Sequence, residues 1–189
     1  MTEEIEKDGV VKEYYESGEL FTESTYISGK IEGVAKEYYE SGELFAESTY
    51  ISGKIEGIVK QYYENGKIET EEVYVGDEAN GSSVVYHENG KIWLFRNFID
   101  SKLDGISKEY YENGSLKLEE TYILGELNGP FIEYYEDGRI KKEENYVNGK
   151  LDMSLGEKIC SAIKIIIFLL IMVSGIAWVV SDWMKIFGN

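Results

Sequence analysis

The 189-residue chain contains one cysteine (Cys160), one proline (Pro130) and one histidine (His87). A single cysteine cannot form an intramolecular disulfide, and the spacing of Cys and His ligands in zinc sites is missing. The chain also lacks the Gly-x-Ser-x-Gly, Walker A and His-Glu-x-x-His patterns of common hydrolase, nucleotide and metalloprotease sites. We therefore expect no enzyme activity and no catalytic, cofactor-binding or metal-binding residues.

Basic charge is also scarce. The formal net charge is −17, and the first residues, MTEEIEKDG, have no apolar core that would indicate a secretory signal peptide. An acidic surface repels nucleic-acid phosphates, so we expect no nucleic-acid partner and regard a basic protein as the complementary one. The alternative is that the charge keeps a tyrosine-rich surface soluble.

Glycines spaced 24 residues apart mark six tandem copies of one unit between residues 9 and 152. They are Gly9, Gly33, Gly57, Gly81, Gly105 and Gly129. With this glycine as position 1, the Tyr at position 6, the Glu at position 8 and the Gly at position 10 are also the same in every copy. A fixed period of this size is typical of stacked repeats, in which no unit buries its own apolar face.

Each unit reads as a β-hairpin. Runs such as VVKEYY and ELFTESTYI flank a Glu-Ser-Gly, Glu-Asn-Gly or Glu-Asp-Gly turn, and a second turn is expected near Ser-Gly-Lys or Asn-Gly-Lys. Strict alternation along the second strand would place Leu20 on the same face as Thr22 and Tyr26. We therefore predict an all-β repeat array, an elongated single-layer antiparallel sheet of stacked β-hairpins.

The pattern Tyr-Tyr-Glu-Asn-Gly-Lys followed by Tyr-x-x-Gly-Lys-x-x-Gly resembles the MORN repeat family, in particular the variant dominated by the YYENGK hairpin. The resemblance covers residues 9–152. It implies the stacked-hairpin fold. Bacterial members of this variant often carry an antitoxin label, and more distant MORN proteins act as scaffolds that contact membranes or partner proteins.

A second segment follows the repeats. Residues 159–180 form an apolar run whose only charge is Lys164, which is long enough to cross a bilayer and apolar on every side. We predict one C-terminal transmembrane α-helix, with Lys158, Lys164, Trp178 and Trp183 at the membrane interfaces. A buried core helix is the alternative.

The expected organisation is then a tail-anchored protein of the inner, cytoplasmic membrane with one pass and the repeats in the cytoplasm. Its segments are a lead-in (1–8), six repeats (9–152), a short linker (153–158), the transmembrane helix (159–180, with 155–185 as its widest extent) and a tail (181–189).

The fourth copy departs from the other five. His87 replaces a tyrosine, Trp93 stands where the other copies have Phe, Glu or Lys, and Phe95 and Arg96 interrupt a surface that is Glu and Ser elsewhere. Because Trp and Arg are enriched in binding hot spots, we predict that these four residues form a partner patch. The alternative is repeat drift or a packing adjustment.

Two functions fit these observations. The first is a membrane-anchored, non-enzymatic module that binds or neutralises a protein partner, as an antitoxin or immunity protein does. The second is a membrane effector of the toxin or anti-phage type, in which the C-terminal helix assembles and perturbs the bilayer while the repeats oligomerise or sense a trigger. In both, lipid contacts the helix, and a homo-oligomer is compatible.

Overall fold

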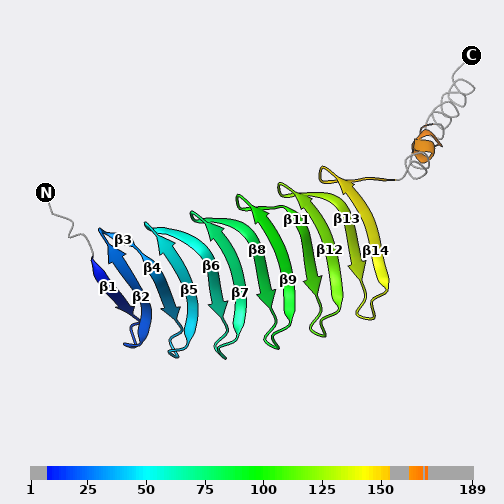
Figure 1. The fold of residues 1–189 in the computed structure, drawn as a ribbon. Coiled ribbons are helices and arrows are strands. Elements are labelled where there is room, and N and C mark those ends of the chain that lie inside the picture. Colours follow the sequence, from blue (N-terminus) through cyan, green and yellow to red (C-terminus); the bar gives the residue numbers. More distant parts are fainter. Residues whose placement is uncertain (1–7, 154–161, 168, 170–189) are drawn as a thin grey trace, which may run out of the picture. The chain divides into compact units, whose positions relative to one another are not determined.

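The structure is a computed structural model that describes residues 8–153, 162–167 and 169. By its internal contacts the chain divides into two units, Met1–Lys150 and Leu151–Asn189. The first unit is one antiparallel sheet, in which hairpin follows hairpin in the order of the sequence (Figure 1). This confirms the predicted single-layer array of stacked hairpins.

The strands are named in chain order. They are β1 (Gly9–Tyr14), β2 (Leu20–Ile27), β3 (Lys30–Ile31), β4 (Gly33–Tyr38), β5 (Leu44–Ile51), β6 (Lys54–Tyr62), β7 (Ile68–Val75), β8 (Glu78–Tyr86), β9 (Ile92–Ile99), β10 (Lys102–Leu103), β11 (Gly105–Tyr110), β12 (Leu116–Ile123), β13 (Glu126–Tyr134), β14 (Ile140–Val147) and β15 (Lys150–Leu151).

The first turn of each copy is a type I turn closed by a glycine bulge. In copy one, the Tyr15 carbonyl accepts a hydrogen bond from Gly18 N–H at 3.0 Å, and Tyr15 N–H donates to the Glu19 carbonyl at 2.9 Å. Gly18 has a φ of 94°, in the left-handed region that glycine adopts without steric cost. The predicted role of the glycine at position 10 is confirmed.

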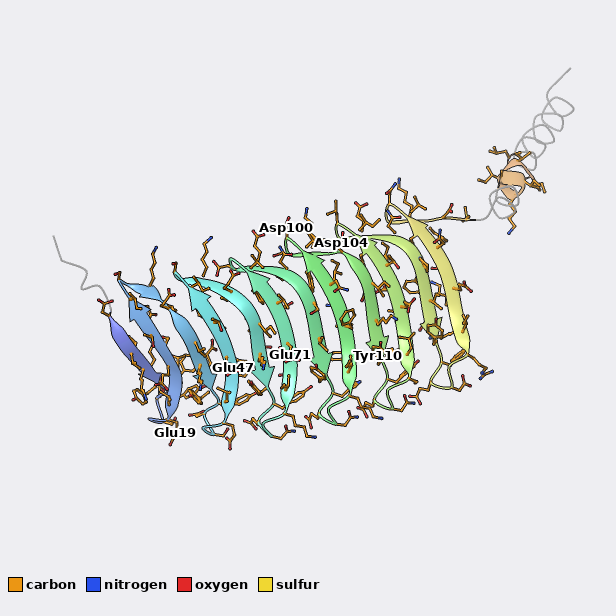
Figure 2. The ribbon with its side chains drawn as sticks, in the orientation of Figure 1. Glu19, Glu47, Glu71, Asp100, Asp104 and Tyr110 are labelled. Atoms are coloured by element: carbon orange, nitrogen blue, oxygen red, sulfur yellow. The ribbon has the colours of Figure 1, made fainter. Side chains whose placement is uncertain are left out.

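The second turn contains two residues with positive φ, which is the geometry of a type I′ hairpin. In copy one these are Ser28 (φ 50°) and Gly29 (φ 72°), between the paired residues Ile27 and Lys30. Copy four keeps this geometry without glycine, since Asp100 and Ser101 have φ values of 48° and 59° there. These turns lie along one edge of the sheet and the first turns along the other, as Asp100 and Glu19 show in Figure 2.

A β-bulge in each hairpin corrects the predicted faces. Glu13 pairs with Thr22, whereas the next residue, Tyr14, pairs with Leu20, so Phe21 is the extra residue. Leu20 therefore lies on the face of Tyr14, opposite to Thr22. Strict alternation was wrong because one inserted residue shifts the side-chain period.

The register defines two faces, which we call face A and face B. Face A carries positions 3, 5, 14, 16 and 18, and face B carries positions 2, 4, 6, 12, 15 and 19. Among the described residues only Ala46 (7% exposed) and Ser107 (5%) are buried. The array is therefore held together by contacts between neighbouring strands and copies, without an enclosed core.

The opening glycine of each copy has a positive φ, between 81° and 134°. At Gly81 an added Cβ would lie 2.9 Å from the Cβ of Val73, and at Gly129 it would lie 3.1 Å from that of Thr121. Gly57, Gly81 and Gly129 sit where β6, β8 and β13 bulge away from the preceding strand. The 24-residue glycine period therefore reflects a backbone conformation that other residues strain to adopt.

Of the second unit the structure describes residues 151–153, of which Leu151 ends β15, and residues 162–167 and 169, which are helical. Within the described part of the chain, no helix combines the length and the apolar character needed to cross a membrane. Most of the predicted transmembrane helix (159–180) lies outside the described residues, as do Lys158, Trp178 and Trp183. The membrane span therefore stays a prediction.

Replacing Gly81 with alanine should lower the melting temperature more than Gly57→Ala. Both glycines have positive φ, but only at Gly81 does the new Cβ meet a neighbouring Cβ, and its φ of 134° is the less accessible to alanine. We expect a loss of roughly 1–3 kcal/mol at Gly81. Thermal unfolding followed by circular dichroism measures both variants. Adding Val73→Ala to Gly81→Ala should recover part of the loss, and equal melting temperatures would contradict this account.

Candidate functional site

Tyrosine hydroxyls connect four of the five pairs of successive copies at the first-turn edge. The hydroxyl at position 7 donates to the main-chain carbonyl at position 6 of the following copy. The pairs are Tyr15 to Tyr38 at 2.7 Å, Tyr39 to Tyr62 at 2.7 Å, Tyr63 to Tyr86 at 2.6 Å and Tyr111 to Tyr134 at 2.9 Å. Burial, followed by nearby carboxylates such as Glu69, raises the pKa of Tyr63, so the phenol stays a donor.

His87 occupies this place in copy four. Its Nε2 lies 3.3 Å from the Tyr110 carbonyl, so Nε2–H is the donor if the bond is made. A histidine reaches less far than a tyrosine, and the distance is the longest in the series. The departure at His87 therefore changes the contact between copies four and five as well as the surface.

The side chain at position 13 packs against the ring at position 7. The ring centroids of Tyr39 and Phe45 are 5.0 Å apart, and those of His87 and Trp93 are 6.0 Å apart. In copy five the ammonium of Lys117 takes the same place, 5.8 Å from the Tyr111 ring centroid. In copies one, two, four and five the bulged residue thus covers the ring at position 7.

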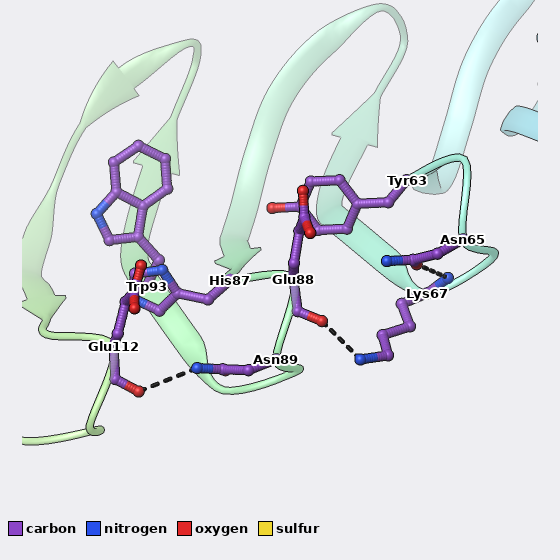
Figure 3. Close-up of a pocket in the computed structure, with 8 residues that line it drawn as sticks. All are labelled: Tyr63, Asn65, Lys67, His87, Glu88, Asn89, Trp93 and Glu112. Carbon is purple, nitrogen blue, oxygen red and sulfur yellow. Dashed lines mark hydrogen bonds between the residues drawn. The ribbon is translucent and has the colours of Figure 1, made fainter.

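A groove of about 760 Å³ opens along this edge at copies three to five. Figure 3 shows its aromatic rings on one side and the turn amides and Lys67 on the other. We call it the turn-edge groove. Its lining residues are Tyr63, Asn65, Lys67, His87, Glu88, Asn89, Trp93 and Glu112.

Hydrogen bonds between successive turns stabilise the groove. Lys67 Nζ donates to the Glu88 carbonyl at 2.6 Å, and Asn89 Nδ2 donates to the Glu112 carbonyl at 3.1 Å (Figure 3). The Asn65 side chain accepts from Lys67 N–H at 3.0 Å, so position 9 caps the turn. The carboxylates of Glu88 and Glu112 lie in exposed residues at the groove. Exposed carboxylates beside aromatic faces suit a cationic group.

The predicted four-residue patch is divided by the sheet. His87 and Trp93 lie together in the turn-edge groove, and Trp93 Nε1 is 3.3 Å from a Glu109 carboxylate oxygen. Phe95 pairs with Val84 on face B, so it does not join them.

Arg96 lies on face A, where it pairs with Ser83. Burial raises the pKa of Glu120 in copy five, and a hydrogen bond from Tyr122 and the charge of Arg96 partly offset that rise. Arg96 thus interacts with the face A carboxylate of Glu120 and is not among the groove residues.

Six groove residues were not among the predicted patch residues: Tyr63, Asn65, Lys67, Glu88, Asn89 and Glu112. The repeat period did indicate that such residues lie together, because residues 24 apart become neighbours when the copies stack. The missing information was which of the two turn edges collects the aromatic rings. That depends on the bulge at position 13, which no residue type specifies.

Comparisons with known proteins identify the repeats. The family model described as MORN repeat variant matches residues 7–28, 31–52, 55–75, 103–123 and 127–148, more than half of the chain, and passes over the fourth copy. A comparison with curated proteins gives no match. A crystal structure of the GtfA/B complex bound to UDP and GlcNAc matches with 14% identity over 59% of this chain and 22% of that chain, at a TM-score of 0.26. So weak a likeness supports no conclusion.

Removing one ladder hydroxyl should destabilise the array. Tyr39→Phe keeps the ring contact with Phe45 but leaves the Tyr62 carbonyl without this donor, and we expect a loss of about 0.5–1.5 kcal/mol. Tyr14→Phe is the matched control, because Tyr14 is 59% exposed at the end of the sheet. Chemical unfolding followed by circular dichroism compares the two. If Tyr14→Phe costs as much as Tyr39→Phe, the ladder bond contributes nothing measurable.

Proposed function

The chain belongs to the MORN repeat variant family, and on that premise we propose that it is a non-enzymatic module that binds a basic protein partner through the turn-edge groove. The observation that carries this proposal is the meeting of aromatic rings and exposed carboxylates in one groove, at the copy that departs most from the repeat. The repeats supply the scaffold, and copy four supplies the distinguishing residues.

The groove chemistry selects the kind of partner. A lysine or arginine side chain can lie over the face of an aromatic ring within about 6 Å while its donors reach a carboxylate. Trp93, which is 43% exposed, supplies such a face, and Glu88 and Glu112 supply the carboxylates. Lys67 does not outweigh these groups, because Glu88 and Glu112 leave the groove lining with a net negative formal charge.

Charge along the same edge supports capture of a basic partner. Position 8 carries a glutamate in every copy, and all six are exposed: Glu16, Glu40, Glu64, Glu88, Glu112 and Glu136. A row of like charges raises the rate of encounter with an oppositely charged surface. The row would steer the partner, and the groove in copies three to five would retain it.

In this proposal, the C-terminal segment decides where in the cell the module is located. The apolar run of residues 159–180 would anchor the protein in the cytoplasmic membrane, with the repeats in the cytoplasm. A membrane-anchored acidic module that occupies a basic or membrane-acting protein fits the role of an antitoxin or immunity protein. The partner's inhibition would then follow from its retention at the membrane surface.

The test begins with the partner. The full chain in mild detergent is used to capture proteins from its native cells, and mass spectrometry identifies a partner retained at low salt and released at high salt. Binding of the purified partner is then measured by surface plasmon resonance as separate association and dissociation rates. Capture of acidic proteins alone, or a salt-independent association rate, would contradict the proposal.

Two pairs of variants separate retention from steering. Trp93→Ala should raise the dissociation rate about 10-fold or more, whereas Phe45→Ala, at the same position in copy two, should leave it unchanged. Glu88→Gln with Glu112→Gln should lower the association rate and its salt dependence. The same change at Glu16 and Glu40 tests whether the position 8 glutamates outside the groove also contribute to the association rate. Equal dissociation rates for the Trp93 and Phe45 variants would remove the groove from the binding site.

A further inference from the structure

Face B exposes a continuous row of branched aliphatic side chains. The row combines positions 2 and 19, and position 19 is Ile or Val in all six copies. We call it the aliphatic stripe. Its members, 44–61% exposed, are Val10, Ile27, Val34, Ile51, Ile58, Val75, Ile99, Ile106, Ile123 and Val147.

The strand register makes the stripe continuous. Ile58 pairs with Val73 and Glu56 with Val75, so Ile58 and Val75 are diagonal neighbours on face B. The same offset brings together positions 2 and 19 of the other hairpins, and each hairpin lies beside the next in the sheet. Ser82 and Pro130 replace the aliphatic residue at position 2 in copies four and six, so the stripe narrows there.

The charges on face B cancel one another. Lysines at position 4 pair with glutamates at position 15, at 3.3 Å for Lys12 and Glu23 and at 3.1 Å for Lys108 and Glu119. In contrast, the glutamates of position 8 lie at the first-turn edge. The excess negative charge that would oppose self-association therefore lies mostly away from the stripe.

We propose that the aliphatic stripe is the interface through which a second copy of this chain packs face to face. Ten half-exposed valine and isoleucine side chains present roughly 800 Å² per copy, which is the area that each partner of a standard interface buries. Both copies carry the stripe with the same period, so a two-fold axis brings equivalent rows together. Two such sheets pack about 10 Å apart, a distance at which these side chains interdigitate.

This interface leaves the turn-edge groove accessible. The rings at positions 7 and 13 lie on the face A side, as the ion pair of Lys117 at position 13 with Glu109 at position 5 indicates. A dimer would therefore present two grooves and bind a multivalent partner more tightly than a single copy does. The dimer does not depend on the groove being functional, so each inference can fail alone.

The experiment measures the mass of the full chain in a density-matched detergent by sedimentation equilibrium. The wild type should have twice the chain mass of 21.6 kDa at micromolar concentration. Ile51→Lys with Val75→Lys should raise the dimer dissociation constant at least about tenfold, because burial leaves the new charges unpaired and facing one another. A wild-type protein that sediments as one copy would overturn the proposal.

A control pair tests whether added charge alone separates the copies. Leu124→Lys with Ser41→Lys adds the same charge at exposed turn residues outside the stripe and should leave the dimer intact. A dimer that withstands the stripe lysines, or that the control disrupts equally, would also overturn the proposal. If circular dichroism shows that the stripe lysines unfold the sheet, Ile51→Ser with Val75→Ser replaces them, with the same expected direction.

Discussion

The bond between the hydroxyl at position 7 and the main-chain carbonyl of the next copy holds this molecule in register. Only Ala46 and Ser107 are buried among the described residues, so no enclosed core aligns the copies. At the first-turn edge the alignment comes from the tyrosine ladder. At the second-turn edge, acids at position 24 accept from the next turn, as Glu32 does from Ser52 N–H at 2.7 Å. An array built this way lies in a single layer, because each copy adds its strands to the end of the same sheet and makes its bonds within that sheet.

In an open single layer, binding surfaces form at the edges and on the faces of the sheet. The turn-edge groove exists where His87 replaces a ladder tyrosine and Trp93 fills the position that Phe45 fills in copy two. The aliphatic stripe exists because each hairpin repeats the same face B residues. The two surfaces thus have different origins. The groove depends on residues of copy four that differ from those of the other copies, and the stripe depends on residues that are similar in most copies.

The glutamates form two groups, one bonded within the sheet and one exposed at the turns. Glutamates at position 15 bond to tyrosines of the following copy, as Glu47 and Glu71 do to Tyr62 and Tyr86 at 2.9 Å, and Figure 2 shows both glutamates on the sheet. Burial, and then the bond to Glu47, raises the pKa of Tyr62 to about 12, so this phenol donates throughout the physiological range. The carboxylates at position 8 lie at the turns instead, where they remain available to a partner.

The repeat period, the hairpins and both turns could be read from the residues, because glycine and Asn-Gly or Ser-Gly pairs have local conformational preferences that neighbours do not override. The faces could not be read, since the bulge at Phe21 and its equivalents depends on pairing with the opposite strand. For the same reason the sequence suggested one patch of His87, Trp93, Phe95 and Arg96, whereas only His87 and Trp93 lie in the groove and the sheet places Phe95 and Arg96 on opposite faces. Local backbone preference was encoded in single residues, and which side chains meet was decided only when the strands paired and the copies stacked.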